Sequence, residues 1–286
     1  MRILWYNNTK VLGVYMTSGY YAATGGMVSE FNKLDQISNN LANLNTPGFK
    51  RDDVVVGDFL RLYQNYRDKL PLHDQTKQAA KYLNRNLNRV PIITERYTDY
   101  SLGPMQKTDN ELDFALSDSN AYFAVQTPQG VAFTRDGSFT IDSQGFLSTK
   151  EGYHVLSRGG IENQAGIQML PGSSVSVNPN GAIFFRQGDE EVPGGNLAIV
   201  GFESQKLLKK IGNNLYTYPQ EKMAERVELN APIVRQHFLE KSNVNAVLEM
   251  TRLIEANRLV DMYSKVLKTH MDDMHTEAIN KLALRA

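Results

Sequence analysis

The side chains that could carry acid–base or metal chemistry are five histidines and a few carboxylate pairs. His270 and His275 are five residues apart in a segment with helical spacing. They therefore lie about 140° apart around a helix axis, too far to share one metal ion. The chain has no cysteine, which excludes disulfides and thiolate metal sites. It also lacks a phosphate-binding Gly-x-x-x-x-Gly-Lys loop and a Gly-x-Ser-x-Gly nucleophile turn. We predict no catalytic residue, no cofactor and no metal site.

Carboxylates in predicted turns leave one enzymatic alternative open. A glycan hydrolase needs two carboxylates held across a cleft. Glu190, Glu191, Asp136 and Asp142 lie in turns from which a carboxylate could reach a substrate. The alternative function is therefore a peptidoglycan-acting enzyme, although solvated turn ends explain these residues equally simply.

Helical heptad patterns occupy both ends of the chain. In residues 27–45, interrupted once by Glu30, the apolar a and d positions are Met27, Leu34, Ile37, Leu41 and Leu44. From Asn245 to about Leu284 the apolar row is Leu253, Ala256, Val260, Tyr263, Leu267, Met271, Met274, Ala278 and Leu282. Steps of three and four residues keep such side chains on one helix face.

The second helix would be roughly 60 Å long, beyond the usual globular helix. A row of that length needs a partner, either the first helix or another copy of the chain. The predicted assembly interface is Leu34, Ile37, Leu41, Leu44, Leu253, Val260, Tyr263, Leu267 and Met274. The pattern predicts assembly through the two ends.

Asparagines gather near the end of the first helix. Asn39, Asn40 and Asn43 are predicted to fix register at the packed face, the alternative being a solvated helix surface. Asn245 precedes the long helix and is predicted to be its N-cap. The turn at Pro47-Gly48 ends the first helix.

Between the helices the chain reads as short strands and glycine-containing turns. The predicted strands are residues 112–116, 122–127, 131–134, 139–141, 174–177, 182–186 and 197–202. Gly-containing turns between them indicate an antiparallel meander, with a hairpin turn at residues 134–137 in which Arg135 pairs across strands. The fold class is therefore α+β: a central antiparallel β-domain enclosed by terminal helices that form a coiled-coil-like domain.

The predicted organisation has four parts. Residues 1–15 form a disordered extension, with Met16 as an alternative start, and residues 16–50 and 240–286 form the helical domain. Residues 109–239 form the β-domain. Residues 51–108 are a connector, with a strand near Val54–Val56, short helices over residues 58–69 and 76–88, and an extended stretch over 89–100. Phe49, Lys50 and Arg51 form either a packing elbow into the connector or a loop.

Charge and hydropathy restrict the partners. Lys plus Arg and Asp plus Glu are both 31, so no net field attracts nucleic acid or an anionic lipid surface. No stretch approaches 18 apolar residues, so we expect no membrane insertion.

Three blocks of sequence resemble one family. Residues 38–51, Ser-Asn-Asn-Leu-Ala-Asn-Leu-Asn-Thr-Pro-Gly-Phe-Lys-Arg, resemble the amino-terminal signature of the flagellar axial proteins, which are rod, hook and hook-associated subunits. Residues 112–139 look like the first β-domain of the rod and hook members. Residues 239–245, Leu-Glu-Lys-Ser-Asn-Val-Asn, followed by the long helix, look like the carboxyl-terminal signature. Length favours the FlgF/FlgG rod type over hook proteins, and the Glu-Lys pair before Ser-Asn-Val favours FlgF. A short hook-type subunit is the structural alternative.

The resemblance implies a mechanical role. Such subunits leave the cell through the flagellar type III export apparatus without a cleaved signal, and they polymerise into the periplasm-spanning rod that carries torque from motor to hook. It implies as partners other copies of the chain, neighbouring rod subunits, and hook-side and ring proteins of the basal body.

Overall fold

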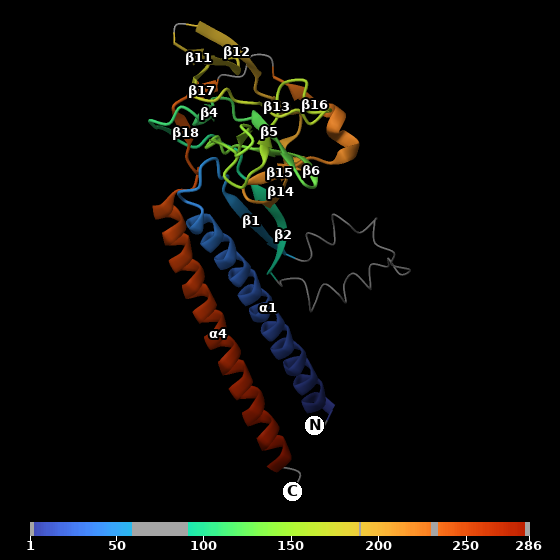
Figure 1. The fold of residues 1–286 in the computed structure, drawn as a ribbon. Coiled ribbons are helices and arrows are strands. Elements are labelled where there is room, and N and C mark those ends of the chain that lie inside the picture. The colour runs from blue at the N-terminus through green and yellow to red at the C-terminus, as the bar shows by residue number, and fades with distance from the viewer. Residues whose placement is uncertain (1–2, 59–90, 189, 230–233, 284–286) are drawn as a thin grey trace. The chain divides into compact units, whose positions relative to one another are not determined.

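The structure is a computed structural model that describes residues 3–58, 91–188, 190–229 and 234–283 (Figure 1). The chain divides into two compact units. Unit 1 comprises residues 1–41, 52–97 and 246–286, and unit 2 comprises residues 42–51 and 98–245. The predicted helical domain and connector are thus divided differently: residues 52–97 group with the helices, whereas residues 42–51 group with the β-rich unit.

Unit 1 is built on two long antiparallel helices, α1 (Ile3–Ala42) and α4 (Ala246–Ala283) (Figure 1). Glycines on α1 allow the close approach of α4. A Cβ on Gly26 would lie 2.4 Å from Cζ of Tyr263, and one on Gly19 would lie 3.4 Å from Nε2 of His270. The helical residues 3–15 correct the predicted disordered extension. A helix gains one hydrogen bond per added residue, and this segment contains no proline to end it.

A two-stranded ribbon completes the described part of unit 1. It pairs β1 (Asp52–Asp58) with β2 (Pro91–Thr98), which confirms the strand expected near Val54 and the extended stretch before Tyr100. The short helices predicted over residues 58–69 and 76–88 lie outside the described residues, apart from Asp58, which ends β1.

Unit 2 is β-rich and antiparallel. Its strands are β3 (Met105–Lys107), β4 (Phe114–Leu116), β5 (Tyr122–Thr127), β6 (Gly130–Thr134), β7 (Thr140–Ile141), β8 (Leu147–Ser148), β9 (His154–Val155), β10 (Ser174–Val177), β11 (Ala182–Gln187), β12 (Glu190–Asn196), β13 (Ile199–Phe202), β14 (Lys209–Gly212), β15 (Leu215–Thr217), β16 (Arg226–Glu228), β17 (Val234–Gln236) and β18 (Phe238–Glu240). Short 3-10 helices η2 (Gln205–Leu207) and η3 (Gln220–Glu225) lie between strands. The predicted α+β class is confirmed.

The strand order of the largest sheet differs from that of a meander, because strands that follow one another in sequence are not always neighbours in the sheet. Its order is β14-β15-β6-β5-β9-β8-β7, and β13 pairs with both β5 and β16. Strand β5 lies inside this sheet and is buried on both faces. Phe123 and Val125 enter one apolar cluster, and Tyr122 and Ala124 enter the other. A strand covered on both sides reads as a continuous apolar run, which is the pattern of residues 121–125.

The hairpin predicted at residues 134–137 is wrong. β6 pairs with β5 and β15, whereas β7 pairs with β8, so the chain crosses from one pairing to another at this point. The backbone approaches that of Phe114 closely at this point, because a Cβ on Gly137 would lie 1.7 Å from the carbonyl oxygen of Phe114. The crossing also buries the Arg135 side chain, which is 2% exposed.

Candidate functional site

A carboxylate and two cations meet in the interior of unit 2. Glu240 Oε1 accepts hydrogen bonds from Lys50 Nζ at 2.6 Å and from the backbone N–H of Gly103 at 2.9 Å. Glu240 Oε2 accepts from Arg135 Nε at 2.8 Å and from Arg135 Nη2 at 2.5 Å. The charged side chains are at most 1% exposed. We call Lys50, Arg135 and Glu240 the charge junction.

The surplus positive charge of the junction is solvated by backbone. Arg135 also donates to the carbonyl oxygens of Leu116, Asp118 and Ala121, so its donors are used on several carbonyl dipoles. Lys50 Nζ donates to the carbonyl of Ser101 at 2.7 Å. Burial lowers the pKa of Lys50, and the neighbouring Glu240 carboxylate opposes this shift. A buried ion pair is tolerated only when the remaining polar groups are also satisfied, and this junction meets that condition.

Backbone contacts bring the same segments together. The N–H of Gly48 donates to the carbonyl of Glu240 at 2.7 Å. Gly48 has φ +68, and a Cβ there would lie 2.4 Å from the carbonyl carbon of Arg135, so the turn at Pro47-Gly48 requires glycine. The segment before α4 makes a further contact through Asn243, whose Oδ1 accepts a hydrogen bond from the N–H of Arg51 at 2.7 Å. Asn243 Nδ2 donates to the carbonyl of Asp99 at 2.8 Å.

The junction therefore unites segments that are remote in sequence. Lys50 follows the end of α1, Arg135 leaves β6, and Glu240 ends β18 shortly before α4. Each lies in one of the sequence blocks that showed the resemblance. The elbow reading of residues 49–51 agrees with this arrangement. Arg135 pairs with Glu240 and not with a residue of a neighbouring strand. Glu240 was not among the functional residues predicted from the sequence. Its sequence signal is a lone carboxylate between apolar Leu239 and a short polar run.

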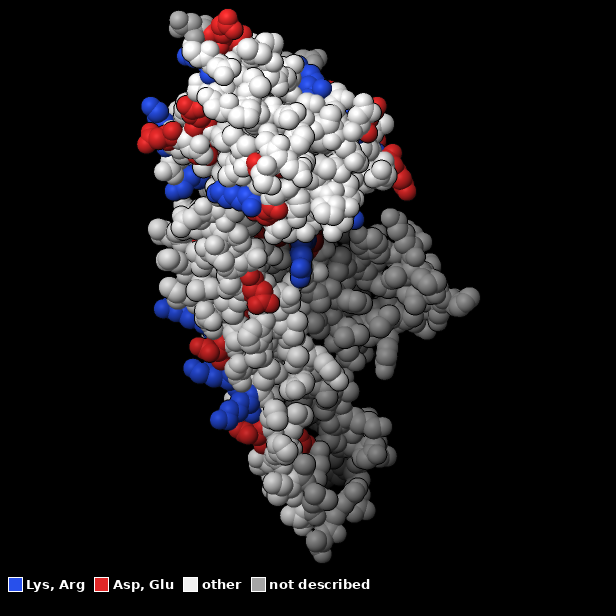
Figure 2. Space-filling model, viewed as in Figure 1, with Lys and Arg blue, Asp and Glu red and all other residues white. Residues whose placement is uncertain are grey.

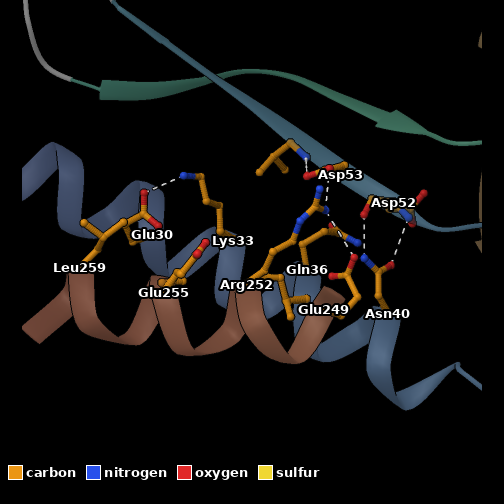
Figure 3. Close-up of a pocket in the computed structure, with 13 residues that line it drawn as sticks. Glu30, Lys33, Gln36, Asn40, Asp52, Asp53, Glu249, Arg252, Glu255 and Leu259 are labelled. Carbon is orange, nitrogen blue, oxygen red and sulfur yellow. Dashed lines mark hydrogen bonds and ion pairs between the residues drawn. The ribbon is translucent and has the colours of Figure 1, made fainter. Parts of the chain in front are cut away.

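Asn40 and an ion-pair cluster hold the ribbon in unit 1. Asn40 Nδ2 donates to the carbonyl of Asp52 at 2.8 Å, and its Oδ1 accepts from the N–H of Asp52 at 3.1 Å (Figure 3). Arg252 Nη1 lies 3.3 Å from Asp53 Oδ2 and 3.4 Å from Glu249 Oε1. These groups border a cavity of about 230 Å³ lined by α1, β1 and α4. Asn40, predicted to fix register, thus fastens α1 to β1 of its own chain.

The predicted interface residues are placed unequally. Ile37 is buried, and most of the others are half-buried: Leu34, Leu41, Leu44, Leu253, Val260, Tyr263 and Leu267. Met274 is 38% exposed, and Met271 is 46% exposed. Asn39 is exposed, and Asn43 Oδ1 accepts from the Thr46 hydroxyl at 3.1 Å in the turn after α1. Asn245 directly precedes α4, the N-cap position.

Three of the four predicted turn carboxylates, Asp136, Asp142 and Glu191, have structural partners, and Glu190 and Glu191 lie in β12 and not in a turn. Asp136 Oδ1 accepts from the Ser138 N–H at 2.9 Å, and burial raises the pKa of Asp136. Glu191 pairs with Arg186 across the β11–β12 ribbon. Within the described residues, no group of three or more His, Asp or Glu side chains could hold a metal ion, and no helix is long and apolar enough to cross a membrane.

Comparison with known families gives three matches along the chain. Residues 21–50 match the family described as flagella basal body rod protein, and residues 118–185 match the flagellar hook protein FlgE/F/G D1 domain. Residues 235–281 match the flagellar basal body rod FlgEFG protein C-terminal family. The charge junction takes one residue from the first matched region, one from the second and one from the third, since Lys50, Arg135 and Glu240 fall inside them.

Comparisons with whole proteins agree with these family matches. The flagellar basal-body rod protein FlgG of Bacillus subtilis is 30% identical over 277 residues, covering 93% of this chain and 99% of the relative. FlgG of Buchnera aphidicola subsp. Baizongia pistaciae is 30% identical over 89% of this chain and 96% of the relative. The flagellar basal-body rod protein FlgF of Rhizobium meliloti is 29% identical over 88% of this chain and 93% of the relative.

Proposed function

Because the chain belongs to the flagellar basal-body rod protein family, we propose that this structural subunit of the basal body polymerises and carries torque through the rod. Its partners in this proposal are other copies of itself, neighbouring rod subunits, and hook-side and ring proteins. The proposal includes delivery by the flagellar type III export apparatus.

The charge junction is the observation that supports a role in carrying torque. The chain passes between unit 1 and unit 2 at four places in the sequence, residues 41/42, 51/52, 97/98 and 245/246. All three junction residues belong to unit 2: Lys50 comes just before the second of these places, Glu240 comes shortly before the last, and Arg135 directly follows β6. A force that enters unit 2 through the segment of Lys50 or the segment of Glu240 is therefore resisted by buried charge-assisted hydrogen bonds.

The surface is compatible with close stacking of copies. The formal net charge is zero, and Figure 2 shows Lys and Arg interspersed with Asp and Glu on the face in view. Copies brought together therefore meet no broad repulsive field. In the cavity of unit 1, Lys33 pairs with Glu30, and Arg252 pairs with Asp53 and Glu249.

A catalytic role has no support in the site geometry. Asp136 is held by Ser138, and Glu191 is held by Arg186. We propose that the protein is not an enzyme. Changing Asp136, Asp142, Glu190 and Glu191 singly to the matching amide should preserve motility, with protein level as the control. Loss of both motility and a peptidoglycan-cleaving activity in one variant would reverse this proposal.

Electron cryomicroscopy of basal bodies tests the assembly proposal. A strain lacking this chain should lose density in the rod, and re-expression of the chain should restore it. The resemblance to the FlgF type implies a proximal position in the rod, so the missing density should lie nearer the motor than the hook. Loss of density in the hook would favour the short hook-type alternative, and an unchanged basal body would reject the assignment.

A further inference from the structure

The last two strands of unit 2 complete pairings with strands that lie far earlier in the chain. Strand β17 pairs with β4, and strand β18 pairs with β3. Among the strands that the structure describes, β4 and β3 have no other strand partner. The three residues of β4 are at most 1% exposed, so their backbone groups cannot bond to water if β17 is missing. We call residues 234–240 the closing segment.

Side chains of the closing segment also reach the middle of the chain. Val234 is 3% exposed and belongs to the same apolar cluster as β4. Gln236 Oε1 accepts a hydrogen bond from the N–H of Val177 at 3.0 Å, and Gln236 Nε2 donates to the carbonyl of Val175 at 2.7 Å. The closing segment therefore binds β10 as well as β3 and β4.

The closing segment contains a strained residue at the point where it passes from β4 to β3. His237 has φ +62, a left-handed conformation that is uncommon for residues other than glycine. Its N–H donates to the carbonyl of Asp113 at 2.9 Å, and its carbonyl accepts from the N–H of Thr108 at 2.7 Å. Strain of this kind persists only where the surrounding structure imposes it, so the closing segment takes this shape only together with β3 and β4.

The charge junction makes a detached closing segment costly for the rest of unit 2. Glu240 is the last residue of the segment, and it bonds to both Lys50 and Arg135. The side chains of these two cations are 0% exposed. Cations that stay buried after their carboxylate has left are strongly unfavourable. Unit 2 therefore cannot keep its native interior while the closing segment is detached.

We propose that unit 2 becomes stable only when the closing segment is in place, and that unit 2 opens as a whole when the segment leaves. A chain that emerges amino end first then keeps the strands from β3 to β16 open until Glu240 has emerged. This inference goes beyond the proposed function and rests on it only for delivery through the export apparatus. For a chain exported in that direction, unit 2 folds only after residues 1–240 have left the channel.

Native-state hydrogen exchange of the purified full chain tests this coupling. Peptides that cover residues 234–240 and residues 121–134 report on the closing segment and on the central strands β5 and β6. Parts of one cooperative unit share one opening free energy, so the protection factors of the two peptides should agree within about tenfold and fall together as denaturant is added. A larger deficit in the closing segment would overturn the proposal, because the segment would then leave a folded core behind.

Substitution of the whole junction separates the effect of the charges from that of the strand pairings. Lys50→Met, Arg135→Met and Glu240→Met together remove every junction charge, and apolar replacement of a complete buried ion cluster is often neutral or stabilising. In this triple variant the protection factor of the closing segment should fall more than about tenfold below that of residues 121–134. The matched control, Arg186→Met with Glu191→Met, removes an exposed ion pair and should stay coupled. Unchanged coupling in the triple variant would overturn the role of the charges.

Refolding provides a second measurement that needs no variant. The unsubstituted full chain is diluted out of denaturant and labelled with short deuterium pulses at increasing times. Both peptides should become protected in the same kinetic phase, and earlier protection of residues 121–134 would overturn the proposal. Neither measurement involves assembly. Failure of the coupling would therefore leave the rod assignment standing, and failure of the rod assignment would leave the coupling standing.

Discussion

Glu240 Oε2 accepts two hydrogen bonds from Arg135, at 2.8 Å from Nε and 2.5 Å from Nη2, across 105 residues of sequence. With Lys50 on Oε1, the carboxylate is surrounded by two cations in a site closed to solvent. Removing a single member leaves buried charge without compensation, which is more damaging than never having placed charge there.

Glu240→Gln should destabilise unit 2 strongly. The amide removes the negative charge that offsets Lys50 and Arg135, and breaking a buried pair by removing one partner costs about 3–5 kcal/mol. Denaturant unfolding of the full chain, followed by near-ultraviolet circular dichroism, measures the change. Glu191→Gln is the matched control, because its Arg186 partner is exposed and such pairs contribute about 0–1 kcal/mol. Equal losses in both variants would contradict a special role for the junction.

Two glycine-to-alanine changes on α1 should differ in sign. Gly19→Ala places its methyl 3.4 Å from His270, an ordinary contact, and gains up to about 1 kcal/mol of helix propensity. Gly26→Ala places its methyl 2.4 Å from the ring of Tyr263, so the ring must leave its packed position. Helicity and thermal unfolding of the full chain compare the two. Gly26→Ala combined with Tyr263→Ala should recover part of the loss, and no recovery would mean that the ring is not the obstacle.

Leu267→Asp should abolish motility while unit 2 keeps its fold. Leu267 is half-buried on the row of α4 that includes Tyr263, and a carboxylate there opposes helix pairing by about 2 kcal/mol. Thr269→Asp introduces the same charge at an exposed position two residues away and should leave motility intact. Swimming assays and the amount of chain in purified basal bodies provide the measurement. Motile Leu267→Asp cells would remove the helical pair from the assembly mechanism.

The turn between β7 and β8 should weaken in acid. Hydrogen bonds from the Phe146 and Gln144 backbone N–H groups, together with His154, hold the pKa of Asp142 below its ordinary 3.8. A carboxyl whose pKa is lower in the folded state stabilises the fold above the unfolded pKa and loses that contribution as pH falls through the folded pKa. Titration of the Asp142 carboxyl by NMR should therefore give a midpoint below 3.8. Asp142→Asn removes this dependence, and a midpoint at or above 3.8 would contradict the prediction.

The sequence determined the elements whose pattern is local. The heptad rows that contain Ile37 and Leu267 are repeated at helical spacing, so both long helices could be predicted. Strands such as residues 174–177 were found with their correct bounds, because alternation and flanking glycines are also local signals.

Tertiary structure alone decided the pairing of distant segments. Nothing near Arg135 indicates that its partner is Glu240, because a buried ion pair depends on distance in space and leaves no periodicity in the sequence. The same holds for Asn40, whose side chain completes the hydrogen bonding of β1 at Asp52. The crossing from β6 to β7 was mistaken for a hairpin for this reason: local turn residues fix where a chain bends, whereas burial of β5 on both faces decides which strands it then joins.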